Sequence, residues 1–258
     1  MKIFLATLES ETATINKLIS NVKRLKWNLM SYFVIRKNKQ SSWEKIINIS
    51  DKILIDSGAF SFQRGNGKVD FYKYTNEYAN WIVKNDRQNI IGFFEMDIDN
   101  IVGYDEVLKY REILESASKK IIPVWHKNRG ITEYTKMCQN YSGKIVAISG
   151  PNKEILDDQY ILFLKEAWKY NCRLHGLGIT DKKVLNKVPF DYCDSCSWRQ
   201  DAIHGRIGNY KINRKLYKTK HHSDWKLLGY LEWMKIQEHY YKKWRYLDEQ
   251  NARQFNFA

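Results

Sequence analysis

The sequence lacks any apolar run that could cross a membrane. Spanning a bilayer takes about 20 consecutive apolar residues, and the 258-residue chain contains no such stretch. Neither a secretory signal nor a lipidation motif is recognisable, so we expect a cytoplasmic protein without a membrane partner. Low-complexity segments and linkers are also missing, which predicts a single domain over residues 1–258.

Cysteine is scarce, and its spacing does not suit a metal site. Of the four cysteines only Cys193 and Cys196 form a Cys-x-x-Cys pair, and Cys172 with His175 supplies at best an irregular second pair. A structural zinc site needs two well-spaced pairs of ligands. We therefore predict no metal and no cofactor, and thiols that stay reduced.

Acidic residues are outnumbered by basic ones. Lysine and arginine total 43 against 29 aspartates and glutamates, which gives a net charge of +14. An excess of this size favours a polyanionic partner, and nucleic acid is the first candidate. A basic protein from a lysine-rich proteome stays open as an alternative, because isoleucine, asparagine and tyrosine are abundant too.

Apolar, β-rich runs alternate with amphipathic helical stretches along the chain. We expect eight strands at residues 2–7, 29–35, 52–56, 90–97, 120–125, 144–149, 173–179 and 190–194. Expected helices between them include residues 71–84, 104–116, 132–140 and 153–170. This alternation predicts an α/β fold, specifically a (β/α)8 TIM-type barrel. An open, doubly wound sheet is the alternative, because periodicity does not reveal closure.

The C-terminal region follows a different pattern. Residues 224–250 contain no proline and one glycine, which predicts one long helix rich in aromatic and basic side chains. Such a helix could follow a phosphate backbone and stack on an unpaired base. It could equally pack its aromatic rings on the barrel and leave its lysines solvated.

Three expected strands end in carboxylates, at Asp56, Asp97 and Asp194. Residues at the C-terminal ends of barrel strands converge on one pocket. Two or more carboxylates there suit displacement at the anomeric carbon of a sugar, where one attacks and another moves protons. Capping a helix or forming a turn is the alternative role for any one of them.

The segments around these aspartates resemble the tRNA-guanine transglycosylase superfamily. Residues 56–60, Asp-Ser-Gly-Ala-Phe, resemble its Asp-Ser-Gly-Gly-Phe/Tyr-Gln signature, with Ala59 in place of the second Gly and Ser61 in place of Gln. Residues 96–98 resemble the strand end that recognises the base, and residues 193–198 resemble the segment with the nucleophilic Asp of archaeal members. Further pieces in the same order are residues 123–126, 148–150 and 175–179.

The resemblance implies a glycosyltransferase that exchanges guanine in nucleic acid for a 7-deazaguanine, such as preQ0, without cutting the backbone. It implies that Asp194 attacks C1′ and holds a covalent glycosyl intermediate, and that Asp56 is the acid/base. Asp97 would bind the purine edge and Phe60 would stack on its face. The other substrate-binding residues that it implies are Ser57, Gly58, His126, Ser149, Gly150, Gly178 and Arg206.

Departures from the family pattern indicate which members of the superfamily the chain resembles most. Residues 199–220 lack the family's zinc-binding cysteines, and the chain has no room for the RNA-binding domains of archaeal members. What remains resembles compact phage-type relatives. Their Asp-Ser-x-Ser-Trp pattern fits residues 194–198, and their Gly-x-Arg-x-Gly pattern resembles residues 204–208, with His204 in place of the first Gly. This favours DNA over tRNA as the substrate, in a bacterial or phage-infected cell.

Several alternatives remain open on the sequence. His126 stands where the family has a base-reading Gln, so the incoming base is not identified. A tRNA-guanine transglycosylase is one alternative. A nucleic-acid N-glycosidase, with water as the second nucleophile, is another, and a non-catalytic nucleic-acid-binding module is a third.

Overall fold

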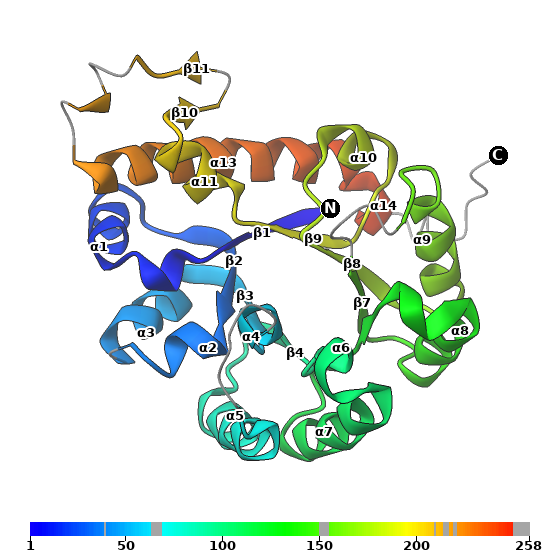
Figure 1. Ribbon diagram of the computed structural model, residues 1–258. Helices are drawn as coiled ribbons and strands as arrows, with labels where there is room; N and C mark the ends of the chain where they lie inside the picture. Colours follow the sequence, from blue (N-terminus) through cyan, green and yellow to red (C-terminus); the bar gives the residue numbers. More distant parts are fainter. Residues whose placement is uncertain are drawn as a thin grey trace.

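The structure is a computed structural model that describes residues 1–38, 40–62, 69–149, 155–208, 210–213, 217–218 and 221–249. Within these residues, nine short parallel strands curve into a nearly closed barrel with helices packed around it (Figure 1). The predicted α/β barrel is therefore confirmed.

The strands form one sheet in the order β5-β4-β3-β2-β1-β9-β8-β7-β6. They are β1 (Lys2–Ala6), β2 (Leu25–Ser31), β3 (Ser50–Asp56), β4 (Ile90–Phe94), β5 (Ile121–Ile122), β6 (Val124–Trp125), β7 (Ile145–Ser149), β8 (Arg173–Leu177) and β9 (Tyr192–Ser195). A separate antiparallel hairpin joins β10 (Arg206–Ile207) to β11 (Tyr210–Lys211).

The two ends of the sheet are the two halves of one predicted strand. Pro123 separates β5 from β6, and a proline has no N–H to donate to a sheet. Its carbonyl still accepts from the backbone N–H of Ala147 at 2.9 Å. Across the same seam, the Glu95 carboxylate accepts from the backbone N–H of Val124 at 2.8 Å. The chain itself thus bridges the ends of the sheet, and eight expected strands become nine.

Helices connect successive strands, as the alternation predicted. They are α1 (Thr12–Asn21), α2 (Tyr32–Ile35), α3 (Gln40–Ile49), α4 (Ala59–Phe62), α5 (Phe71–Asn85), α6 (Asp99–Val102), α7 (Tyr104–Ala117), α8 (Gly130–Asn140), α9 (Tyr160–Lys169), α10 (Lys182–Lys187), α11 (Ser197–Ile203), α13 (His222–Trp244) and α14 (Tyr246–Glu249), with 3-10 turns η1 (Leu8–Ser10) and η2 (Lys127–Arg129). Among the described helices, none is both long and apolar enough to span a bilayer.

The strand expected at residues 29–35 is the largest error of the sequence prediction. The strand β2 begins earlier, at Leu25, and ends at Ser31, and the next four residues form the short helix α2. Tyr32 is buried there and stacks on Tyr78 of α5, with ring centroids 4.7 Å apart. Tertiary packing of this aromatic pair therefore overrides the β-propensity of the segment.

The long C-terminal helix exists, but it is interrupted. Helix α13 ends at Trp244 and α14 begins at Tyr246, while Gln250, the last residue of the expected helix, lies outside the described residues. Tyr230 of α13 donates to Asn28 at 2.6 Å, and the Gln237 amide donates to the carbonyls of Ile3 and Trp27. The helix is thus anchored to β1 and β2, as the packing interpretation expected.

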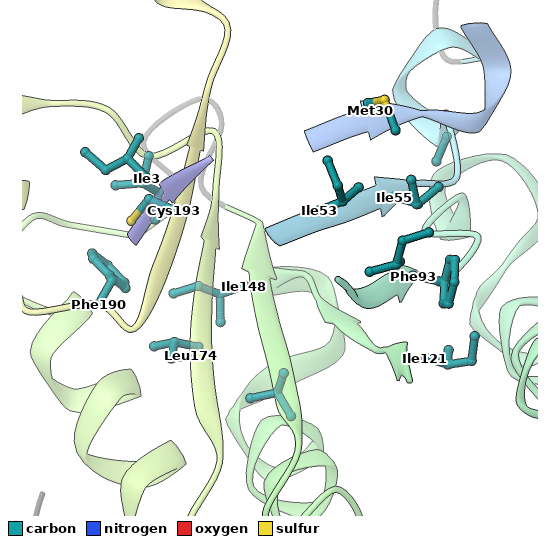
Figure 2. Close-up of a cluster of buried hydrophobic side chains, with 14 of the residues drawn as sticks. Ile3, Met30, Ile53, Ile55, Phe93, Ile121, Ile148, Leu174, Phe190 and Cys193 are labelled. Carbon is teal, nitrogen blue, oxygen red and sulfur yellow. The ribbon is translucent and has the colours of Figure 1, made fainter. Parts of the chain in front are cut away.

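Alternation along each strand decides what faces the inside of the barrel. On β3, Leu54 belongs to the inner cluster, whereas Ile53 and Ile55 pack with the surrounding helices. Figure 2 shows side chains of this outer layer, with Ile3 near Cys193 at the left and Ile53, Ile55 and Phe93 at the right. Side chains two residues apart share a face. Asp56 therefore follows Leu54 to the inner face, and Asp194 follows the inner Tyr192.

The inner cluster yields a stability prediction. Phe94 is fully buried in the barrel interior, with its ring centroid 5.0 Å from that of His175. We expect Phe94→Ala to lower the free energy of unfolding by about 3–5 kcal/mol, because it leaves a cavity between strands. Urea unfolding is the measurement. The control is Val83→Ala on α5, a site that is 66% exposed; equal effects of the two substitutions would contradict a packed barrel interior.

Candidate active site

A pocket of about 550 Å³ lies at the C-terminal ends of the barrel strands. The three carboxylates predicted from the strand ends, Asp56, Asp97 and Asp194, all line it. The geometry therefore brings together residues that are up to 138 positions apart in the sequence (194 − 56). Helix capping explains none of the three, because no described helix begins at these residues. The other alternative, a turn former, does apply to Asp56, whose carboxylate accepts from the backbone N–H two residues on.

Asp56 ends β3, and a glycine turn holds its carboxylate. Gly58 has φ of +88°, and its backbone N–H donates to Asp56 Oδ2 at 2.9 Å. A Cβ on residue 58 would lie 2.3 Å from Cβ of Phe33, so the turn requires glycine. Burial, together with the nearby Asp97 and Asp194 charges, raises the pKa of Asp56 from 3.8 to about 7, although the Gly58 N–H opposes this rise. Asp56 can therefore both give and take a proton near neutral pH.

Asp194 is held differently. Its Oδ1 accepts from the backbone N–H of Gly178 at 2.9 Å and lies 3.0 Å from Nε2 of His175. The described residues give Oδ2 no hydrogen bond, and Asp194 keeps 14% of its side chain exposed in the pocket. One oxygen of Asp194 is thus held by Gly178 and His175.

His175 orients Asp194 from inside the barrel. The imidazole is fully buried among the rings of Phe4, Phe94 and Tyr192. Its Nδ1 has no hydrogen-bond partner within the described residues, so a proton there would be a buried donor without an acceptor. The neutral tautomer protonated on Nε2 therefore fits this site and donates to Asp194.

Asp97 is supported from behind by a charged network. His126 Nε2 lies 3.4 Å from Asp97 Oδ2 and 3.8 Å from Asp99 Oδ1. Burial raises the pKa of Asp97, and the neighbouring His126 offsets part of that rise. The pKa of His126 is itself raised, because the attraction of Asp97 and Asp99 outweighs the effect of burial, which lowers it. Arg129 in turn donates to Asp99 at 2.9 Å and lies 3.3 Å from buried Glu95.

Of the other predicted substrate-binding residues, Phe60, Ser149 and Gly178 line the pocket. Phe60 is 56% exposed. Ser149 ends β7 and is buried, and Gly178 follows β8, where its N–H already serves Asp194.

The remaining predicted binding residues lie elsewhere. Ser57 and Gly58 build the turn behind Asp56, and the Ser57 carbonyl accepts from the Tyr74 hydroxyl at 2.6 Å. His126 contacts Asp97 rather than the pocket space, and Arg206 on β10 forms an exposed ion pair with Asp201 at 3.0 Å. None of these four belongs to the described lining, because alternation and turn geometry direct them away. Gly150 lies outside the described residues.

The sequence prediction missed two residues of the site, Glu9 in the pocket lining and His175, which contacts Asp194. Glu9 follows β1 in the turn η1 and lines the pocket, although it is only 1% exposed. Burial raises the pKa of Glu9 from 4.5 to about 7, and Arg199 opposes that rise. An acidic residue shortly after a strand was the signal used for the three aspartates, and Glu9 carries the same signal. His175 lies two residues before Leu177 on β8, and Leu177 packs against the inner cluster. Alternation along the strand therefore indicates that His175 also faces the inside of the barrel.

The residues that were considered as metal ligands do not gather. Cys193 is buried in the outer layer of β9, whereas Cys196 is exposed at the pocket. Within the described part of the chain, no three His, Cys, Asp or Glu side chains are placed to hold a metal ion. Freedom from metal stays a prediction, which elemental analysis of the purified protein tests.

The raised pKa of Asp56 predicts how stability depends on pH. The folded state holds this proton more tightly than the unfolded chain, so the wild type loses stability as pH rises from about 4 towards about 7. Asp56→Asn removes this loss, and its advantage over the wild type should grow by about 1–3 kcal/mol between about pH 5 and pH 8. Urea unfolding across this range is the measurement.

The matched control is Asp51→Asn, which changes an exposed residue at the other end of the same strand. It should follow the pH profile of the wild type. A constant difference between Asp56→Asn and the wild type at all pH values would show that Asp56 titrates in the ordinary acidic range.

The chain was also compared with known proteins. It matches no protein-family model and no curated protein. The resemblance to the tRNA-guanine transglycosylase superfamily therefore rests on the motifs alone.

Proposed function

We propose that this protein exchanges a purine base in nucleic acid through a covalent intermediate on Asp194. One observation carries the proposal: Asp56, Asp97 and Asp194 line one pocket, and each is held by a different set of partners. Carboxylates with distinct environments are what a double displacement needs, since one must attack while another moves protons.

In the first half of the reaction, Oδ2 of Asp194 attacks C1′ of the target nucleotide. The bond from C1′ to the base nitrogen breaks, and its electron pair leaves with the base. Asp56, with a pKa near 7, delivers its proton to the departing base. The products are a glycosyl ester on Asp194, a neutral base and the Asp56 carboxylate.

The second half reverses these steps with another base. The Asp56 carboxylate removes a proton from the incoming base, whose nitrogen attacks C1′ as the ester bond to Asp194 breaks. Both displacements invert C1′, so the overall exchange retains its configuration and leaves the backbone intact. His175 and Gly178 stabilise the Asp194 carboxylate when it is released.

The pocket walls supply recognition of the base. Asp97, supported by His126, accepts from the N–H edge of a purine, and exposed Phe60 stacks on its face. A base can enter such a pocket only when it is turned out of its stack. The net charge of +14 favours electrostatic binding of the phosphate backbone outside the pocket. DNA is the favoured substrate, because residues 194–198 and 204–208 resemble the compact DNA-modifying relatives.

An exchange assay tests this function. Wild-type protein incubated with labelled guanine and duplex DNA or tRNA should incorporate the label into one of them. Asp194→Asn should abolish incorporation, because an amide is a poor nucleophile. Asp56→Asn should slow it by about 10²–10⁴-fold, because only proton transfer is lost.

Asp51→Asn, at the opposite end of β3 from Asp56, should leave the exchange rate unchanged. Release of guanine from the nucleic acid without incorporation would identify an N-glycosidase instead. Full activity of Asp194→Asn would remove the proposed nucleophile.

Binding to nucleic acid should depend strongly on salt. If lysines and arginines neutralise several phosphates, affinity should fall at least about tenfold between roughly 50 and 200 mM salt. Fluorescence anisotropy of a labelled oligonucleotide measures this fall. An affinity that does not change with salt would contradict binding through contacts between basic side chains and phosphates.

A further inference from the structure

The two ends of the barrel differ in charge. At the C-terminal end, the described lining of the candidate active site holds four carboxylates and one basic side chain. At the N-terminal end, a second cavity of about 210 Å³ lies around the first residues of β4, β5, β7 and β8. The charged side chains of its lining within the described residues are all basic, and they are Lys119, Lys120, Lys144 and Arg173.

Alternation along the strands also places basic residues at this second end. On β8, Arg173 comes two residues before the inward-facing His175, and Lys120 comes two residues before Ile122 of the inner cluster. Side chains two residues apart share a face, so Arg173 and Lys120 start on the inner side of the barrel. Ile122 is buried below them, and Ile145 packs against the same inner cluster. The cavity therefore has an apolar floor and a basic rim.

Two of the four basic residues already have carboxylate partners. Lys120 donates to Asp86 at 2.6 Å and to two backbone carbonyls, so its three donors are all used. Nη1 of Arg173 lies 3.4 Å from a carboxylate oxygen of the buried Asp191. These two ion pairs hold the rim together and offset two of its positive charges.

The other two, Lys119 and Lys144, are exposed, and neither forms an ion pair within the part of the chain that the structure describes. Nζ of Lys144 lies 5.4 Å from the ring centroid of Tyr141. Glu112 and Glu115 line a separate hollow beside the same two lysines, and the Tyr141 hydroxyl donates to Glu115. Two positive charges at the rim of the cavity thus lack a paired carboxylate among the described residues.

The size and charge of the cavity indicate its ligand. Sites for drug-sized molecules are typically about 300–1,000 Å³, so a cavity of about 210 Å³ suits a smaller ion. A phosphate monoester carries close to two negative charges at about pH 8, because its second pKa is about 6. Two ammonium groups match that charge and donate charge-assisted hydrogen bonds to phosphate oxygens. A phosphodiester has a single negative charge, which matches the two lysines less well.

We propose that the cavity at the N-terminal end of the barrel binds a phosphate dianion between Lys119 and Lys144. The ligand is either inorganic phosphate or the terminal phosphate of a small organic monoester. Arg173, whose side chain is 38% exposed, borders the same space. The site lies at the opposite end of the strands from Asp56 and Asp194, and it does not depend on the proposed base exchange.

Isothermal titration calorimetry at about pH 8 and low salt tests the site. The probes are inorganic phosphate, glycerol 3-phosphate and the diester dimethyl phosphate, none of which contains a base that could enter the other pocket. We expect the wild type to bind one inorganic phosphate per chain. Replacing both lysines, by Lys119→Gln together with Lys144→Gln, should weaken this binding at least about tenfold, because two charged donors are lost. Both residues are exposed, so the double variant should fold, and urea unfolding checks this.

The matched control combines Lys136→Gln on α8 with Lys235→Gln on α13. It removes the same two charges at residues that are 62% and 74% exposed and lie outside the described lining, and it should keep the affinity of the wild type.

The probes also distinguish the two sources of the phosphate. Tighter binding of glycerol 3-phosphate than of inorganic phosphate supports the site and identifies an organic monoester as its ligand class. Equal or weaker binding supports the site and identifies inorganic phosphate. The absence of saturable phosphate binding, or equal affinities of the two double variants, overturns the site. Dimethyl phosphate that binds as tightly as inorganic phosphate overturns the assignment to a dianion. The incorporation assay decides the base exchange separately.

Discussion

The two-residue alternation of side chains along closed, parallel strands is the constraint on which the site depends. On β3 and β9 it turns Leu54 and Tyr192 into the barrel, and two residues later it turns Asp56 and Asp194 to the same side. A shift of one residue in either register would move a carboxylate to the outer layer of Figure 2, among Ile53, Ile55 and Cys193. The packed interior below Asp56 and Asp194 therefore also fixes the positions of these two carboxylates.

Closure of the barrel and support of the site are linked at the seam between β5 and β6. Glu95, directly after β4, accepts from the backbone of Val124 across the seam and binds the guanidinium groups of Arg111 and Arg129. Arg129 also holds Asp99, which faces His126 behind Asp97. The same buried charges that join the ends of the sheet thus support Asp97 in the pocket through Asp99 and His126.

Burial and hydrogen bonds give the carboxylates of the pocket different environments. Asp56 and Glu9 are each raised to a pKa of about 7, chiefly because burial disfavours their charged forms. Asp194 accepts from the backbone N–H of Gly178 and lies beside Nε2 of His175. The two aspartates are therefore held in different environments, although the two side chains are of the same residue type.

The sequence by itself determined the strand–helix alternation and the aspartates at three strand ends, because both depend on local patterns of apolar and acidic residues. Only the tertiary structure decided the split at Pro123, the helix at Tyr32–Ile35 and the places of His126 and Arg206. These depend on contacts between residues far apart in the chain, such as the stacking of Tyr32 on Tyr78. His175 and Glu9 belong to the same class: a histidine within a strand and a glutamate after one become site residues only when closure of the barrel buries them beside the pocket.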